Sequence, residues 1–178
     1  ELGLYTGKGA LVDTFTYQLQ EANLSMGRLI DGGKDWGFFV EPTPGAANSV
    51  QNFEGIVKNA PQFSPLGGIF TSPIQVSIQN TFGGDIYYTT DGSEPTSQSN
   101  KIDKALSIDK TTVIRARIIK KDQVPGEVIT HSYFINKNND LGTLPVVSIC
   151  THPDNFWSAE KGIYVQDFKP EWEVPINI

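Results

Sequence analysis

The sequence has one cysteine in 178 residues, Cys150, which excludes an intramolecular disulfide and a cysteine-based zinc site. Cys150 ends the apolar run that starts at Leu144, and we expect this run to form a buried strand. Only His131 and His152 are available as a base for a catalytic thiol, and neither stands in a supporting motif. We therefore expect Cys150 to be a small buried hydrophobic side chain.

Positive charge is scarce and scattered. Lys and Arg number 14 against 20 Asp and Glu, the net charge is −6, and only Lys120-Lys121 forms a basic cluster. Nucleic acids and anionic membrane surfaces are bound by clustered Lys and Arg. Neither is expected as a partner of this chain.

Long apolar stretches are also missing. No run approaches the ~20 residues of a membrane-spanning helix, and no charged and then apolar leader opens the chain. We expect no membrane insertion by this region. Because the chain begins at Glu1, we expect it to be a piece of a longer protein whose targeting signal lies elsewhere.

Turn-forming residues are plentiful, with 17 Gly and 11 Pro spread along the whole length. This distribution is typical of many short strands joined by turns. Alternating apolar residues predict strands at Ile74–Ile78 and Ile114–Ile118, and further strands are expected at Ala105–Ile108 and Glu127–Ile135. The predicted fold is mainly β, an immunoglobulin-like or fibronectin-III-like sandwich of roughly seven strands with flanking partial β modules.

The run from Ile86 to Thr96 is a β-rich segment that ends in Asp91-Gly92, a strong turn signal. Asp91 and Glu94 resemble a carboxylate pair, but glycoside hydrolysis needs two carboxylates that face each other across a cleft at ~5 to 10 Å. A tight turn offers no such cleft. We therefore interpret Asp91 and Gly92 as structural turn residues.

The first 48 residues contain a hairpin pattern, with strands expected at 3–5 and 10–17 around a glycine-containing loop. Further on come Gly27-Arg28-Leu29, the Asp31–Asp35 turn, Trp36 and the Pro42–Asn48 segment. This order resembles the C-terminal half of a lamin-tail domain, an immunoglobulin-like sandwich whose opening strands are missing here. Residues 1–48 are thus expected to be a partial module, followed by a linker at 49–60. The Asp31–Asp35 segment lacks the spacing of a calcium loop and is interpreted as a turn.

Residues 61–136 carry a second resemblance. Ser64-Pro65 with Gly67-Gly68, the Ile86–Thr96 run, Ile114–Arg117 and Ser132-Tyr133 together resemble the chitobiase/β-hexosaminidase C-terminal domain. The resemblance implies a non-catalytic sandwich found beside catalytic modules in secreted, often carbohydrate-active proteins. It also implies an extracytoplasmic location, secreted or on a bacterial cell surface.

A predicted linker at 137–143 leads to a third segment, 144–178. Its residues Leu144–Ser148, Asp154, Phe156-Trp157, Gly162–Val165 and Trp172–Ile178 resemble the opening of a CotH-type domain, the kinase-like fold named for a spore coat protein. In that family the nucleotide-binding and catalytic elements would lie beyond Ile178. No catalytic role is therefore assigned to any residue present.

Exposed aromatic side chains are the remaining candidates for ligand contact, because sugar rings stack on Trp and Tyr. We select Tyr87, Tyr88 and Trp36 as possible glycan-stacking residues, and strand alternation directs one of the two tyrosines outward. For Trp36, as for Trp157, we favour the alternative that the ring fills a core.

These observations favour a non-catalytic spacer or presentation region of a larger secreted or cell-surface bacterial protein. One alternative is a carbohydrate-binding accessory module, and another is a fragment of a CotH-type kinase-like enzyme whose catalytic part is absent. Expected partners are the remainder of the parent polypeptide and a cell-wall or extracellular glycan. No cofactor and no metal site are expected.

Overall fold

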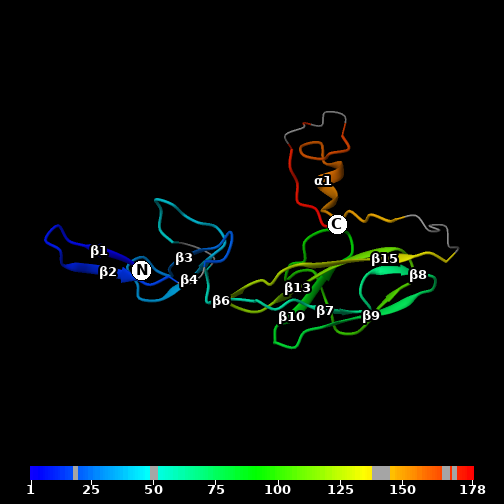
Figure 1. The fold of residues 1–178 in the computed structure, drawn as a ribbon, viewed down its shortest axis with the longest axis horizontal. Helices are drawn as coiled ribbons and strands as arrows, with labels where there is room; N and C mark the ends of the chain where they lie inside the picture. The colour runs from blue at the N-terminus through cyan, green and yellow to red at the C-terminus, as the bar shows by residue number, and fades with distance from the viewer. Residues whose placement is uncertain (18–19, 49–51, 138–144, 166–168, 170–171) are drawn as a thin grey trace. The chain divides into compact units, whose positions relative to one another are not determined.

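The computed structural model describes residues 1–17, 20–48, 52–137, 145–165, 169 and 172–178. The chain divides into two compact units, Glu1–Gly55 and Ile56–Ile178, which are described separately. Both consist mainly of short strands (Figure 1), which confirms the predicted fold class. Among the described residues, no helix is long and apolar enough to cross a membrane.

The first unit contains a hairpin and a small sheet. In the hairpin, β1 (Leu2–Tyr5) pairs antiparallel with β2 (Leu11–Phe15), and the predicted loop is closed by the Thr6 N–H donating to the Ala10 carbonyl at 2.8 Å. The sheet has the order β3 (Ser25–Arg28), β4 (Trp36–Phe39) and β5 (Asn52–Phe53). The hairpin prediction is confirmed, and β5 falls in a stretch that we expected to be linker.

Side chains of the motif in residues 1–48 contact one another within this unit. The Arg28 guanidinium donates to both carboxylate oxygens of Asp13, at 2.6 and 2.7 Å, and lies 4.8 Å from the centre of the Trp36 ring. The Asn48 side-chain amide donates to the Arg28 carbonyl at 2.9 Å. These bonds connect the hairpin, the sheet and the segment before β5 into one unit.

The second unit is a two-sheet sandwich. One sheet has five strands in the order β11 (Asn100–Lys101), β10 (Asp85–Thr89), β13 (Thr112–Ile119), β15 (Ile129–Ile135) and β8 (Gly68–Phe70). The other has the order β12 (Leu106–Ile108), β9 (Ile74–Gln79) and β7 (Gln62–Ser64). Strands β6 (Gly55–Ile56) and β14 (Gln123–Val124) form a separate two-stranded sheet.

The chain changes sheets between β7 and β8. Strand β7 pairs antiparallel with β9, whereas β8 pairs parallel with β15 in the five-stranded sheet. The Ser64–Pro65 peptide bond in the connection is cis. The Gly67 N–H donates to Nδ1 of His131 on β15 at 3.3 Å, which holds the start of β8 against its new neighbour.

The inward faces of both sheets form one apolar core. Val76 and Ile78 of β9 and Ile114, Ala116 and Ile118 of β13 are buried, which confirms both alternation patterns. The remaining buried members of this core are Val57, Phe63, Ile86, Ile108 and Tyr133. Val57 lies in the stretch that we expected to be linker. The Tyr133 hydroxyl donates to the Pro65 carbonyl at 2.9 Å, and burial raises the pKa of Tyr133 to about 12.

After the sandwich, the C-terminal segment (residues 145–178) has little regular structure. It contains the helix α1 (Pro153–Trp157) and one bridge between Cys150 and Asn177. Residues 145–149 form no strand, and Val147 and Ile149 are more than half exposed, so the predicted buried strand is wrong there. Cys150 itself is buried. Leu144, most of the predicted linker 137–143 and residues 49–51 of the other linker lie outside the described residues.

Candidate functional site

The Asp91-Gly92 turn follows β10 and is closed by its own side chains. Asp91 Oδ1 accepts hydrogen bonds from the Ser93 N–H at 2.9 Å and the Ser93 hydroxyl at 2.5 Å. The Thr89 hydroxyl donates to the Ser93 carbonyl at 2.6 Å. Gly92 has a φ of 86°, a left-handed conformation that favours glycine. Bonds to Ser93 stabilise the ionised carboxylate, and they lower the pKa of Asp91.

Two arginines of β13 attach this turn to the outer face of the five-stranded sheet, the face directed away from the other sheet. Arg115 donates from Nη1 to the Gly92 carbonyl at 2.8 Å. Arg117 donates to the Gly126 carbonyl at 3.0 Å and pairs with Glu94 at 2.6 Å. Thus Asp91 and Glu94 both bond to residues of the sandwich, Asp91 to Ser93 and Glu94 to Arg117.

The C-terminal segment contacts the sandwich at two places. The first is the turn, because a Cβ on Gly92 would collide with the Thr151 carbonyl oxygen and would lie 3.8 Å from the Cys150 sulfur. The second is β15, where the Ser132 and Ser148 hydroxyls are hydrogen-bonded at 2.6 Å. Ser132 alternates with the buried Tyr133 on β15, so this second contact lies on the outer face of the five-stranded sheet. Figure 1 shows the C-terminal segment with α1 on one side of the sandwich.

A buried polar network stabilises the segment where it meets the turn. The Thr151 hydroxyl donates to the Pro175 carbonyl and accepts from the Asn155 amide, both at 2.6 Å. Cys150 and Asn177 exchange two backbone hydrogen bonds of 2.8 Å. Thr151 and Asn155 are both buried, and burial raises the pKa of the Cys150 thiol. A thiol held protonated is a poor nucleophile.

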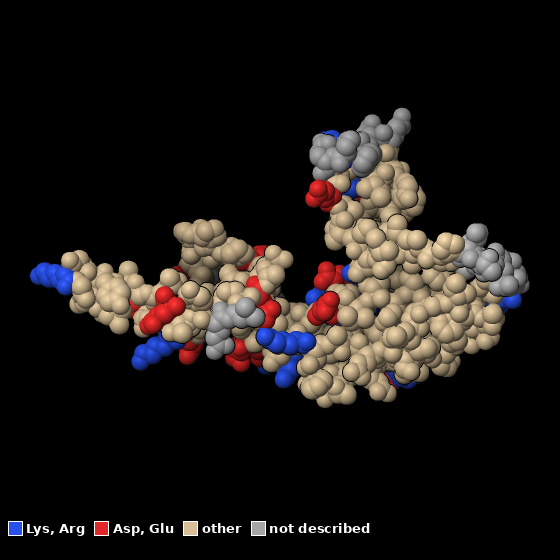
Figure 2. Space-filling model, in the orientation of Figure 1, with Lys and Arg blue, Asp and Glu red and all other residues tan. Residues whose placement is uncertain are grey.

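A groove of about 630 Å³ lies beside these contacts, between the β8–β15 edge and the C-terminal segment. Its walls are mostly apolar, with Ile69 and Phe134 on the sheet side and Val147 and Ile178 on the segment side. His131 also lines it. Burial lowers the pKa of His131, whose ring stands edge-on to Phe63 at 4.7 Å between centroids. Figure 2 shows that few charged residues cover the sandwich on the face in view.

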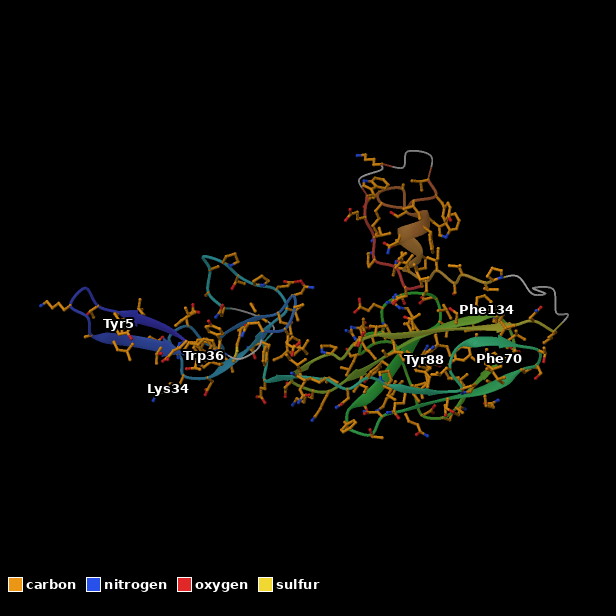
Figure 3. The ribbon with its side chains drawn as sticks, in the orientation of Figure 1. Tyr5, Lys34, Trp36, Phe70, Tyr88 and Phe134 are labelled. Carbon is orange, nitrogen blue, oxygen red and sulfur yellow. The ribbon has the colours of Figure 1, made fainter. Side chains whose placement is uncertain are left out.

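The three aromatic residues selected from the sequence have different surroundings. Tyr88 lies opposite Ala116 and is the inward tyrosine (Figure 3), partly buried against the apolar core. Tyr87 is the outward tyrosine and lies between Arg117 and Lys101 on the neighbouring strands. The Tyr87 side chain is half-buried between these two neighbours.

Trp36 belongs to the first unit and is also half-buried. Its ring stacks on Phe15 with centroids 3.9 Å apart and an interplanar angle of 19°, and the Arg28 guanidinium lies against it. These contacts are those of a ring that fills a small core. They agree with the expectation that Trp36 fills a core.

A different aromatic pair is exposed. Trp157 and Tyr164 are each 66% exposed, and their rings stack at 5.2 Å with an interplanar angle of 27°. The prediction that Trp157 fills a core is therefore wrong. The Tyr164 N–H donates to the Phe156 carbonyl at 2.9 Å, which brings the two rings together across the turn after α1. This pairing depends on a local chain reversal that residue spacing did not reveal.

Comparison with known families identifies one part of the chain. Residues 65–130 match the family model of the chitobiase/beta-hexosaminidase C-terminal domain, which confirms the predicted resemblance over this range. That domain is a carbohydrate-associated β-sandwich module, and residues 65–130 are similar to it. No curated protein matches the chain. Among the described residues, no group of three or more His, Cys, Asp or Glu is placed to hold a metal ion.

Proposed function

We propose that this chain is a non-catalytic spacer and presentation region of a larger secreted or cell-surface bacterial protein. In this account the sandwich holds the C-terminal segment on its outer face and presents it in a fixed position. The observation that carries the proposal is the backbone contact between the Asp91-Gly92 turn and Thr151. The Ser132–Ser148 hydrogen bond supports it independently.

The bonding of the polar residues around the turn also supports a structural role. Asp91 bonds to Ser93, Arg115 to the Gly92 carbonyl, and Glu94 to Arg117. A catalytic acid, base or nucleophile needs a side chain that reaches a substrate. These side chains are instead used to fix the shape of the turn, which is what a docking element requires.

Amide hydrogen exchange of the Gly92→Ala variant tests the proposal. The added methyl would strain the left-handed backbone and collide with the Thr151 carbonyl. We expect exchange at residues 145–158 to become roughly tenfold faster while β9 and β13 stay protected. Gly83→Ala is the matched control, because Gly83 has a similar φ of 79° but open space around its Cβ position. Equal exchange in both variants would remove the docking role.

The extracytoplasmic location is part of this proposal. It is supported by the similarity of residues 65–130 to a carbohydrate-associated module. Fractionation of the native cells, with an antibody raised against the chain, tests it. Detection in the cytoplasmic fraction alone would contradict this part of the account.

Carbohydrate binding is the second candidate function, and the exposed Trp157–Tyr164 pair favours it. An exposed ring face together with nearby polar groups is the combination that sugar recognition uses. Within the described part of the chain, neither the Trp157 indole nor the Tyr164 hydroxyl makes a hydrogen bond. The candidate platform therefore lies on the C-terminal segment, away from the tyrosines selected from the sequence.

The kinase-like reading of residues 144–178 is a further proposal, and the exposure of apolar residues in this segment supports it. Val147, Ile149 and Trp157 are all more than half exposed, as expected for elements that a larger fold would cover. A protein extended beyond Ile178 should then label a protein substrate from ATP while the present chain does not. It should also shield Trp157 from solvent quenching of its fluorescence, whereas a glycan platform would leave Trp157 exposed.

A further inference from the structure

The strand β8 is held at the edge of the five-stranded sheet by few contacts. It has three residues, and among the described strands it pairs only with β15, to which it runs parallel (Figure 1). Its central side chain, Ile69, is 51% exposed. Parallel pairs are slightly less stable per residue than antiparallel pairs, and elements with few buried contacts open first. The contact at the start of β8 is therefore important for keeping this strand in the sheet.

That contact is the hydrogen bond from the Gly67 N–H to Nδ1 of His131, at 3.3 Å. Nδ1 accepts this bond only while it carries no proton, so the imidazole is neutral when β8 is in place. A Cβ on Gly67 would be 2.8 Å from the Ser132 carbonyl oxygen, so Gly67 lies directly against the backbone of β15. A proton on Nδ1 would place two N–H groups against each other at this close contact.

The surroundings of His131 favour the neutral ring. The ring is half-buried, stands edge-on to Phe63 of β7 and lies opposite Ile114 of β13. On its own strand the neighbouring ring is Tyr133, whose raised pKa of about 12 keeps it uncharged. Burial among these side chains lowers the pKa of His131, because the charged ring is better solvated by water than by this apolar environment.

The charged groups of the packed elements are directed elsewhere. Strands β7 and β8 contain no titratable side chain, and the arginines of β13 bond to carbonyls on the outer face. From the C-terminal segment, Cys150 lines the groove together with His131, and its raised pKa keeps the thiol uncharged. His152 lies 3.5 Å from Asp154 in the same segment. Within the described part of the chain, no carboxylate forms an ion pair with His131 that would stabilise its charged form.

We propose that His131 is a pH-operated latch, which holds β8 in the sheet while its imidazole is neutral and releases the strand when it takes up a proton. Acid favours the open form because the ring binds a proton more readily once β8 has left and water reaches it. Release would remove one wall of the groove, since Gly67, Gly68 and Ile69 line it from the β8 side. The latch is separate from the contact between Gly92 and the C-terminal segment, on which the proposed function depends.

Residue-resolved amide hydrogen exchange of the full chain, at about pH 7.5 and about pH 5, tests the latch. Each rate is divided by the intrinsic exchange rate at the same pH. We expect the protection of the β8 amides to fall roughly threefold or more at the lower pH, while the β13 amides lose less. His131→Asn is the matched variant, because its side-chain oxygen can accept the Gly67 N–H and does not titrate. This variant should keep β8 protected at both pH values.

An unchanged protection of β8 in wild type, or an equal loss in wild type and His131→Asn, would overturn the proposal. A second measurement needs no variant and therefore serves if His131→Asn does not fold. The NMR shift of the Gly67 amide should titrate together with the imidazole of His131, since the two groups share the hydrogen bond. A Gly67 amide that stays unchanged while the imidazole takes up its proton would equally exclude the latch.

Discussion

Gly92 and Thr151 are in direct backbone contact, 59 residues apart in the sequence, with no room for a Cβ between them. The contact joins the turn after β10 to the segment that follows the sandwich. Arg115 holds the turn from β13 by donating to the Gly92 carbonyl. The position of the docked segment therefore depends on the turn, and the turn depends on Arg115. Each of these contacts can be changed by a separate substitution.

Replacing Arg115 by Met should lower the free energy of unfolding of the second unit by about 1 to 2 kcal/mol. The substitution removes a charge-assisted hydrogen bond to the half-buried turn while it keeps the length of the side chain. Urea denaturation followed by circular dichroism measures this change. Lys101→Met is the control, since the Lys101–Asp85 pair is about half exposed and such pairs contribute little. A loss no larger than that of the control would remove Arg115 from the account.

Replacing Tyr133 by Phe should cost about 1 to 2 kcal/mol of stability. The ring stays in the core, but the Pro65 carbonyl loses the hydroxyl that donates to it at 2.9 Å. Guanidinium denaturation of the two proteins measures the difference. Tyr87→Phe is the control on the outer face and should be nearly neutral. Equal effects of the two substitutions would contradict the importance of the Tyr133–Pro65 bond.

The stability of the second unit should fall as the pH decreases below ~6.5, in part because of His131. Burial lowers the pKa of His131 below its ordinary value of 6.5, so the unfolded chain takes up the proton first. This contribution is complete above that ordinary pKa and is lost as the pH falls through the lower pKa of the folded protein. His131→Gln should flatten this part of the dependence of Tm on pH. An imidazole titration in the folded protein at or above 6.5 would contradict the prediction.

If the chain binds glycan, Trp157→Ala should abolish retention on insoluble chitin, cellulose or peptidoglycan. The reason is that Trp157 and Tyr164 offer the most exposed stacked rings in the described residues. Tyr87→Ala is the control, because its side chain lies in a row between Arg117 and Lys101. Loss of binding in Tyr87→Ala but not in Trp157→Ala would place the glycan-binding site on β10 instead. No retention of wild type on any polymer would remove this candidate.

Much of the sandwich could be predicted because its information is local. The alternation of apolar and polar residues along β9 and β13 predicts which face of each strand is buried. The Asp91-Gly92 pair predicts the turn that follows β10. The Val146–Ile149 stretch shows the limit of this reasoning. Its apolar residues suggested a buried strand, but a strand also needs a neighbouring edge, and residues 145–149 have none among the described strands.

The candidate site depends on contacts between distant residues, and sequence patterns do not contain these. Nothing near Gly92 indicates that Thr151 will approach it, and nothing near Ser132 indicates a bond to Ser148. The exposure of Trp157 was missed because large aromatic residues are usually expected inside a core. The glycine of the Asp-Gly turn was the available signal, since glycine often marks a close backbone approach.

A cysteine pair at positions 132 and 148 tests the central claim most directly, namely that the sandwich holds the C-terminal segment on its outer face. The Ser132 and Ser148 hydroxyl oxygens are 2.6 Å apart, which is close enough for a disulfide after Ser132→Cys and Ser148→Cys, with Cys150→Ala to remove the native thiol. The control replaces Thr130 instead of Ser132, two residues along β15 and roughly 7 Å away. The account predicts rapid disulfide formation under mild oxidation for the first pair and slow formation for the control. Failure of the first pair to form a disulfide, or equal rates for the two, would contradict it.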